Sequence, residues 1–109
     1  MARVRQRRLF WEPPANTDIQ GYAVYQSAPG DATFLPNVDS GLLTPTWEVT
    51  DSEVLLGAGD LPEGNYQFAV CTVDTAENYS DPYQHPAWAN VPLDLTAPNP
   101  PTGGGLTIV

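Results

Sequence analysis

The chain contains few residues that could perform catalysis or bind a metal. It has one cysteine, Cys71, and one histidine, His85, among 109 residues. Nucleophilic catalysis needs a nucleophile, a base and a group that orients the base, and zinc sites need clustered cysteines and histidines. The sequence also lacks a glycine-rich phosphate loop and a GxSxG motif. We therefore expect no enzymatic activity, no cofactor and no metal site.

Three acidic residues form the arrangement that comes nearest to a cation site. Asp74, Glu77 and Asp81 lie close together in the sequence, around a predicted hairpin turn. Calcium binds carboxylate oxygens, but this spacing matches no known calcium loop. We favour the alternative, in which these residues are solvated acids at the surface.

Aromatic residues are better candidates for binding. Tyr25, Tyr79, Tyr83 and Trp88 are candidates for partial exposure, and exposed aromatics bind sugar rings or protein partners. In the alternative, Tyr83 and Trp88 cover an open end of the fold. These two residues are the interaction candidates of this group, with a protein or a glycan as the partner.

Charge is divided unevenly along the chain. The four basic residues are Arg3, Arg5, Arg7 and Arg8, whereas all thirteen acids lie further along and give a net charge of −9. Such an acidic body repels nucleic acid and anionic membranes, and no apolar run approaches the ~20 residues of a membrane span. We expect protein partners. The arginines form either a plain basic edge or a segment that attracts the acidic surface of another copy.

The elements that position these residues are predicted to be strands between turn clusters. Side chains alternate along 22–26 and along 65–73, so each of these strands has two distinct faces. Further strands are expected around 9–11, 47–49 and 88–95, the last at a sheet edge or bulge because of Pro92. The helix candidate is Ser52–Leu56, which is too short for more than a turn or two.

This pattern predicts an all-β fold, either a sandwich or a barrel, and two sheets that face one another close a common core. Cys71 is expected to pack in mid-strand as a small apolar residue. Trp11 should be the largest contributor to the core. The predicted core residues are Leu9, Trp11, Tyr22, Val24, Trp47, Leu61, Tyr66, Phe68 and Val70.

Four motifs follow one another along about 75 residues. They are LFWEPP (9–14), DIQGYAVYQS (18–27), LPEGNYQFAV (61–70) and VDTAENYSDP (73–82). Together they resemble the fibronectin type III domains, in their bacterial and phage form, and suit the second, third, sixth and seventh strands of that fold. The resemblance implies an immunoglobulin-like, two-sheet antiparallel sandwich. It also implies that the Tyr66 hydroxyl binds upstream backbone, as in a tyrosine corner.

The chain departs from the family in one turn and at both ends. Family members usually have glycine where Glu77 precedes Asn78, so we expect a turn of another type, with Asn78 tolerating positive φ. The chain begins where the family's second strand would begin, so the first strand is expected to be absent. Residues 1–95 are predicted to form the domain, whereas 96–109 (TAPNPPTGGGLTIV) resemble the linker and opening strand of a following domain.

The predicted C-terminal strand has three alternative positions. It pairs with a neighbouring copy, returns to the open edge of its own chain, or remains a loose tail. Self-closure is tight, because residues 96–105 reach at most about 33–36 Å. Pairing with a neighbour needs no reversal of direction. The interaction candidates in this segment are Leu106, Thr107, Ile108 and Val109, together with Arg3 and Arg5 at the opposite end of the sequence.

These observations predict a structural or interaction module with no catalytic role. The resemblance implies a subunit of a secreted, cell-surface or virion assembly, although no signal peptide is visible in the sequence. The expected partners are other copies of the chain or subunits of such an assembly. The alternative is a carbohydrate-binding accessory module that uses loop aromatics.

Overall fold

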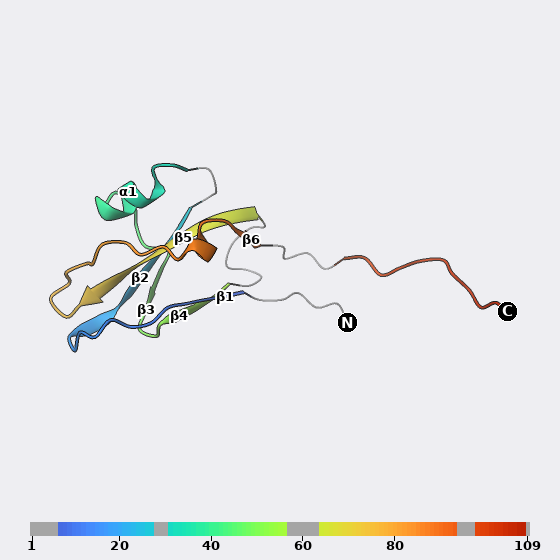
Figure 1. The fold of residues 1–109 in the computed structure, drawn as a ribbon, viewed down its shortest axis with the longest axis horizontal. Helices are drawn as coiled ribbons and strands as arrows, with labels where there is room; N and C mark the ends of the chain where they lie inside the picture. The colour runs from blue at the N-terminus through green and yellow to red at the C-terminus, as the bar shows by residue number, and fades with distance from the viewer. Residues whose placement is uncertain (1–6, 28–30, 57–63, 94–97, 109) are drawn as a thin grey trace.

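The computed structural model describes residues 7–27, 31–56, 64–93 and 98–108. The first three of these ranges contain two antiparallel sheets and almost no helix (Figure 1). The smaller sheet pairs β1 (Arg7–Phe10) with β4 (Glu53–Leu56). The larger sheet has the order β3-β2-β5-β6 and contains β3 (Trp47–Val49), β2 (Ile19–Ser27), β5 (Gly64–Asp74) and β6 (Val91–Leu93). The predicted all-β fold is therefore confirmed. No helix within the described ranges is long and apolar enough to cross a membrane.

The two long strands form the centre of the larger sheet and show the predicted alternation. β2 and β5 pair antiparallel from Ile19↔Asp74 to Ser27↔Gln67, with an irregularity between Ile19 and Gly21. Successive residues of each strand contribute to two different hydrophobic clusters, one on each face of the sheet. Both central strands are thus buried on both sides, which explains their nearly continuous apolar sequence.

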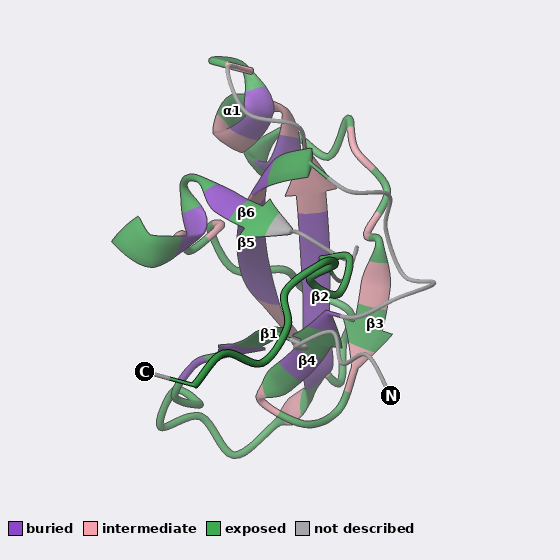
Figure 2. Ribbon diagram, turned by 90° about the vertical axis from the view of Figure 1, so that its right-hand side faces the viewer, coloured by how far each residue is buried: buried purple, intermediate pink, exposed green. Residues whose placement is uncertain are grey.

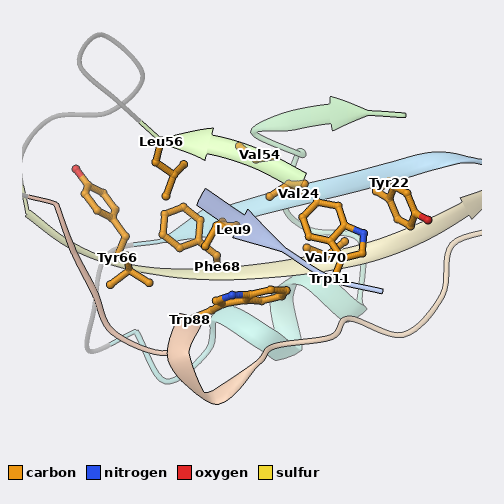
Figure 3. Packing of buried hydrophobic residues seen from close by; sticks show 11 residues of the cluster. Leu9, Trp11, Tyr22, Val24, Val54, Leu56, Tyr66, Phe68, Val70 and Trp88 are labelled. Carbon is orange, nitrogen blue, oxygen red and sulfur yellow. The ribbon is translucent and has the colours of Figure 1, made fainter. Parts of the chain in front are cut away.

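The first cluster joins the two sheets. Side chains of β1 and β4 pack against the inner face of β2 and β5 (Figure 3), and the cluster comprises Leu9, Trp11, Tyr22, Val24, Val54, Leu56, Tyr66, Phe68, Val70, Trp88 and Val91. Seven of these are predicted core residues. Trp47 is partly buried against the cluster, and Leu61 lies outside the described residues. The contact predicted for the Tyr66 hydroxyl stays a prediction, because its upstream backbone includes residues 57–63.

The second cluster lies on the opposite face of the larger sheet, beneath a short helix, α1 (Phe34–Asp39) (Figure 2). Phe34 and Val38, four residues apart and so on one face of the helix, pack with Ala23, Tyr25, Ala69 and Cys71. Cys71 is 2% exposed, which confirms its role as a small apolar residue. Burial raises the pKa of its thiol to about 11.

Three sequence predictions about local structure are wrong. Residues 53–56 form strand β4 rather than a helix, because pairing with β1 satisfies their backbone and alternate burial places Val54 and Leu56 in the core. The helix lies instead at 34–39, a segment for which no helix was predicted. Tyr25 is not partly exposed but 4% exposed, because α1 covers its face of the sheet.

The last predicted strand, 88–95, begins later than expected, and its residues 94 and 95 lie outside the described residues. Trp88 belongs to a 3-10 helix, η1 (Pro86–Trp88), and the described strand is limited to Val91–Leu93. Pro92 lies in β6, which pairs with β5 at the edge of the sheet, as its missing N–H requires.

Residues 98–108 extend away from the two sheets (Figure 1) and are exposed. They contain no helix or strand. The strand predicted at 106–109 is therefore not formed over its described part, because no other strand lies beside it to share its hydrogen bonds. Leu106 and Ile108 are each 98% exposed. Self-closure is not adopted in this structure.

Candidate functional site: the open edge of the smaller sheet

One edge of β1 has no partner strand among the described residues. The Trp11 N–H donates to the Ser52 carbonyl at 3.1 Å, beyond the end of the β1–β4 ladder. In an antiparallel pair the residues that hydrogen-bond to the partner strand alternate with those that do not. Since Leu9 pairs with Val54 in the same register, odd-numbered residues of β1 face β4. The backbone N–H and C=O groups of Arg8 and Phe10 therefore point to the open edge.

The side chains of β1 follow the same alternation. Leu9 and Trp11 are buried, whereas Phe10 is 63% exposed. The Arg8 guanidinium lies 5.2 Å from the centre of the Phe10 ring and 3.4 Å from a carboxylate oxygen of Glu53. Exposed ion pairs contribute little to stability. The outer face of this sheet is thus a solvated surface beside an unpaired edge.

A groove of about 830 Å³ begins at the end of β1. One wall comes from Phe10, Trp11 and the segment that follows them, and the other comes from β5 and residues 78–85. Its lining is mixed. Apolar and aromatic side chains include Ile19, Val70, Tyr79 and Tyr83, and the carboxylates are those of Glu12, Asp18 and Asp74.

Trp11 contributes an unusual feature to this wall. Its Nε1 is buried and has no hydrogen-bond partner in the described part of the chain. The ring itself is well packed, with edge-on contacts to Tyr22 at 5.3 Å and to Trp88 at 6.2 Å between ring centres. An unsatisfied buried donor costs about 1–3 kcal/mol. The groove is therefore lined by a residue that fits the core but lacks a partner for its N–H group.

The aromatic candidates differ in exposure. Trp88 is 5% exposed and packs in the core, so partial exposure is wrong for this residue and the alternative, in which it covers the fold, fits. Tyr83 packs edge-on against Trp88 at 5.5 Å but remains 52% exposed, and Tyr79 is 51% exposed. Backbone bridges to Val70 and Val73 hold both tyrosines against β5. Together with Phe10, which is 63% exposed, Tyr79 and Tyr83 are therefore exposed aromatic side chains of the groove.

The acidic turn after β5 is closed by its own hydrogen bonds. The Asp74 carboxylate accepts bonds from the backbone N–H groups of Ala76 and Asn78 and from the Asn78 side chain. These bonds, chiefly those from Asn78, hold the pKa of Asp74 below its usual value. No group of three metal-binding side chains occurs within the described ranges. The Asp74 oxygens thus serve the turn.

Glu77 adopts the left-handed conformation that was assigned to Asn78. Its φ is 63°, and its N–H donates to the Asp74 carbonyl at 3.0 Å. Hairpin loops with this geometry normally place glycine at the left-handed position, because a side chain is strained there. The positive φ expected at Asn78 is therefore found at Glu77.

Replacing Glu77 with glycine should stabilise the fold by about 0.5–1 kcal/mol. The left-handed region costs an L-residue roughly 1–2 kcal/mol, and the greater freedom of glycine in the unfolded chain cancels part of that gain. Urea unfolding followed by circular dichroism measures the change. Ala76→Gly is the matched control, because Ala76 lies in the same turn without a positive φ, and it should be destabilising. Equal effects of the two substitutions would contradict the strain at Glu77.

The interaction candidates of the C-terminal segment that the structure describes lie away from the groove (Figure 1). Leu106, Thr107 and Ile108 are exposed in the extended tail. Arg3, Arg5 and Val109 lie outside the described residues. Phe10 was not predicted as a site residue, although its position between two predicted core residues already indicated that it points outward.

No family model, curated protein or solved structure matches this chain. Its function therefore has to be argued from the geometry of this site.

Proposed function

We propose that the chain is a non-enzymatic structural and interaction module, a subunit of a larger surface, secreted or virion assembly. In this proposal the two sheets form a fibronectin type III-like sandwich. Two antiparallel sheets over a common core are consistent with such a fold. The four motifs of the resemblance fall on or beside β1, β2 and β5, and the proposed location rests on that resemblance.

The observation that carries this proposal is the unpaired edge of β1 together with an exposed apolar tail. An open edge offers N–H and C=O groups to any extended segment, and proteins usually cover such edges. Leu106 and Ile108 are almost fully exposed on a segment, 98–108, that is neither helix nor strand. Adding a strand from another chain covers the open edge and buries the exposed apolar side chains of the tail at the same time. The C-terminal strand of one copy therefore pairs with β1 of a neighbouring copy.

Deleting residues 103–109 tests this proposal. The full chain should form oligomers whose mass rises with concentration in light scattering, and the truncated chain should remain monomeric with unchanged circular dichroism. The double variant Leu106→Ser, Ile108→Ser should behave like the truncation, because it removes the apolar face of the strand. Leu42→Ser is the matched control, since Leu42 is also exposed (74%) but lies far from the tail in the sequence. A full chain that is monomeric at every concentration would refute strand donation.

Carbohydrate binding is the second candidate, and the half-exposed Tyr79 and Tyr83 beside the groove favour it. Aromatic rings bind the apolar faces of sugars, and carboxylates bind their hydroxyl groups. Binding on a glycan array that is lost on Tyr83→Ala, with assembly unchanged, would support this alternative. Trp88 takes no part in it because the ring is buried.

A further inference from the structure

The direction of the chain at its exit determines which β1 edge the tail can reach. β6 pairs with the start of β5, through Val91↔Tyr66 and Leu93↔Gly64, whereas the groove includes Val70, Thr72 and Asp74 from the later part of β5. β6 thus lies at the end of the body remote from the groove, and the described part of the tail, residues 98–108, extends away from the two sheets (Figure 1). β1 runs the opposite way, because its last residue, Phe10, lines the groove. The departing chain is thus antiparallel to β1.

An antiparallel partner of β1 must enter at the groove end and leave at the Arg7 end. The tail of the same chain would have to turn back and pass along the body before it could enter there. A second copy placed ahead of the tail along the long axis presents its groove end first. The tail then meets the β1 strand of that copy without reversing direction.

We infer that the C-terminal tail of one copy pairs with the β1 edge beside the groove of a second copy, and that the two strands align in a single register. This inference rests on the strand donation proposed above. The inward residues are Leu9 in β1 and Trp11 directly after it, and the residues whose backbone faces the open edge are Arg8 and Phe10. Leu106 and Ile108 share one face of an extended strand. Both turn inward when Leu106 lies opposite Trp11 and Ile108 opposite Leu9.

This register also provides hydrogen-bond partners for the backbone N–H and C=O groups at the open edge of β1. Thr107 then lies opposite Phe10 and exchanges two N–H···O bonds with it, because Phe10 is a residue whose backbone faces the open edge. A shift by two residues would place Ile108 opposite Arg7, which is exposed and charged, and would leave the groove beside Trp11 empty. The chosen register therefore places Leu106 beside Trp11, in the wall of the groove, and Ile108 beside Leu9, a residue of the core.

Charge favours the same head-to-tail arrangement. The groove end carries the carboxylates of Glu12, Asp18 and Asp74. Arg7 and Arg8 begin β1 at the other end, where the tail leaves. When copies follow one another in one direction, the basic end of each faces the acidic end of the next, and unlike charges attract. Such a contact does not close on itself by two-fold symmetry, so it produces a ring or a filament.

A disulfide between two chains tests the register. One chain carries Phe10→Cys and the other carries Thr107→Cys, both with Cys71→Ala so that no other thiol is present. Directly opposed residues of a hydrogen-bonded pair have Cα atoms about 5.5 Å apart, which suits a disulfide. Mixing the two chains under mild oxidation should give a covalent dimer that disappears on reduction. The rate should exceed that of the control several-fold.

In the matched control, the first chain carries Leu55→Cys instead of Phe10→Cys. Leu55 is also exposed (52%) on the smaller sheet, but on β4, one strand further from the open edge. Two strand spacings of about 4.8 Å separate it from the donated strand, which is too far for a disulfide.

Each outcome distinguishes the register from the proposed function. Oligomers that depend on the tail but cross-link no faster at residue 10 than at residue 55 overturn the register and leave strand donation standing. A chain that carries both Phe10→Cys and Thr107→Cys and forms the disulfide within a monomer overturns the second copy as the partner. A chain that forms no oligomers overturns the proposed function itself.

Discussion

Replacing Trp11 with alanine is expected to lower the free energy of unfolding by about 3–5 kcal/mol, the range for large-to-small changes at aromatic core residues. The indole is 9% exposed and lies between the two sheets. Its removal leaves a cavity and also eliminates the edge-on contacts with Tyr22 and Trp88, which add stability beyond area burial. Urea unfolding followed by far-ultraviolet circular dichroism is the appropriate measurement, because Trp11 itself contributes to the fluorescence signal.

Two further substitutions separate packing from hydrogen bonding at this position. Trp11→Phe should cost much less than Trp11→Ala, because phenylalanine keeps part of the ring volume and removes an N–H that has no partner in the described residues. Phe10→Ala, at the adjacent exposed position, should change stability by no more than about 0.5 kcal/mol. If Trp11→Ala were as mild as Phe10→Ala, the indole would not belong to the core.

The alternation of β2 and β5 could be predicted from the sequence, but not what covers each face. A period of two assigns Tyr22 and Val24 to one face and Ala23 and Tyr25 to the other, and the two clusters follow this division. The same period occurs whether the second face meets solvent or a helix. Tyr25 was therefore placed correctly within its strand and incorrectly with respect to solvent.

Neither the helix α1 nor the strand β4 could be predicted from the local sequence, and the reason is the same for both. A helix of six residues is unstable by itself, and α1 includes Pro36 in its first turn, where proline is tolerated. Burial of Phe34 and Val38 stabilises it. In the same way, Glu53–Leu56 is too short to show a period, and its pairing with β1, more than forty residues away, selects the strand. Tertiary contacts determine both elements.

The candidate site shows the same limit. The outward direction of Phe10 follows from its alternation with Leu9 and Trp11. The groove does not, because its two walls come from segments about 60 residues apart in the sequence. Trp88 and Tyr83 are similar aromatics in the same segment, and only packing against Trp11 and the core distinguishes the buried ring from the exposed one.

Replacing Phe34 with alanine is the second substitution expected to have a large effect, a loss of about 3–5 kcal/mol. Phe34 is 0% exposed and connects α1 to the outer face of the larger sheet. Because α1 depends on tertiary contacts, the loss of this ring should release the helix and uncover Cys71. Alkylation of the native protein at neutral pH should therefore become many times faster in Phe34→Ala, and mass spectrometry measures its rate.

Alkaline pH should act on the same cluster. Burial raises the pKa of the Cys71 thiol from 9.0 to about 11. Burial also raises the pKa of the Tyr25 hydroxyl from 10.0 to about 12, and the charge of the nearby Cys71 adds a smaller effect. A group whose pKa is higher in the folded state favours folding below its unfolded pKa, and this contribution is lost as the pH rises toward the folded value. Stability should thus fall between about pH 9 and 12, and Cys71→Ala should remove the earlier part of that fall.

Leu42→Ala provides the comparison for both measurements. Leu42 follows α1 closely but is 74% exposed, so its truncation should alter neither the unfolding free energy by more than about 0.5 kcal/mol nor the alkylation rate. If Cys71 stayed as unreactive in Phe34→Ala as in the original chain, α1 would not be the element that shields it. In that case α1 would not be needed to bury the second face of β5, and the packing of this helix would not be essential to the core.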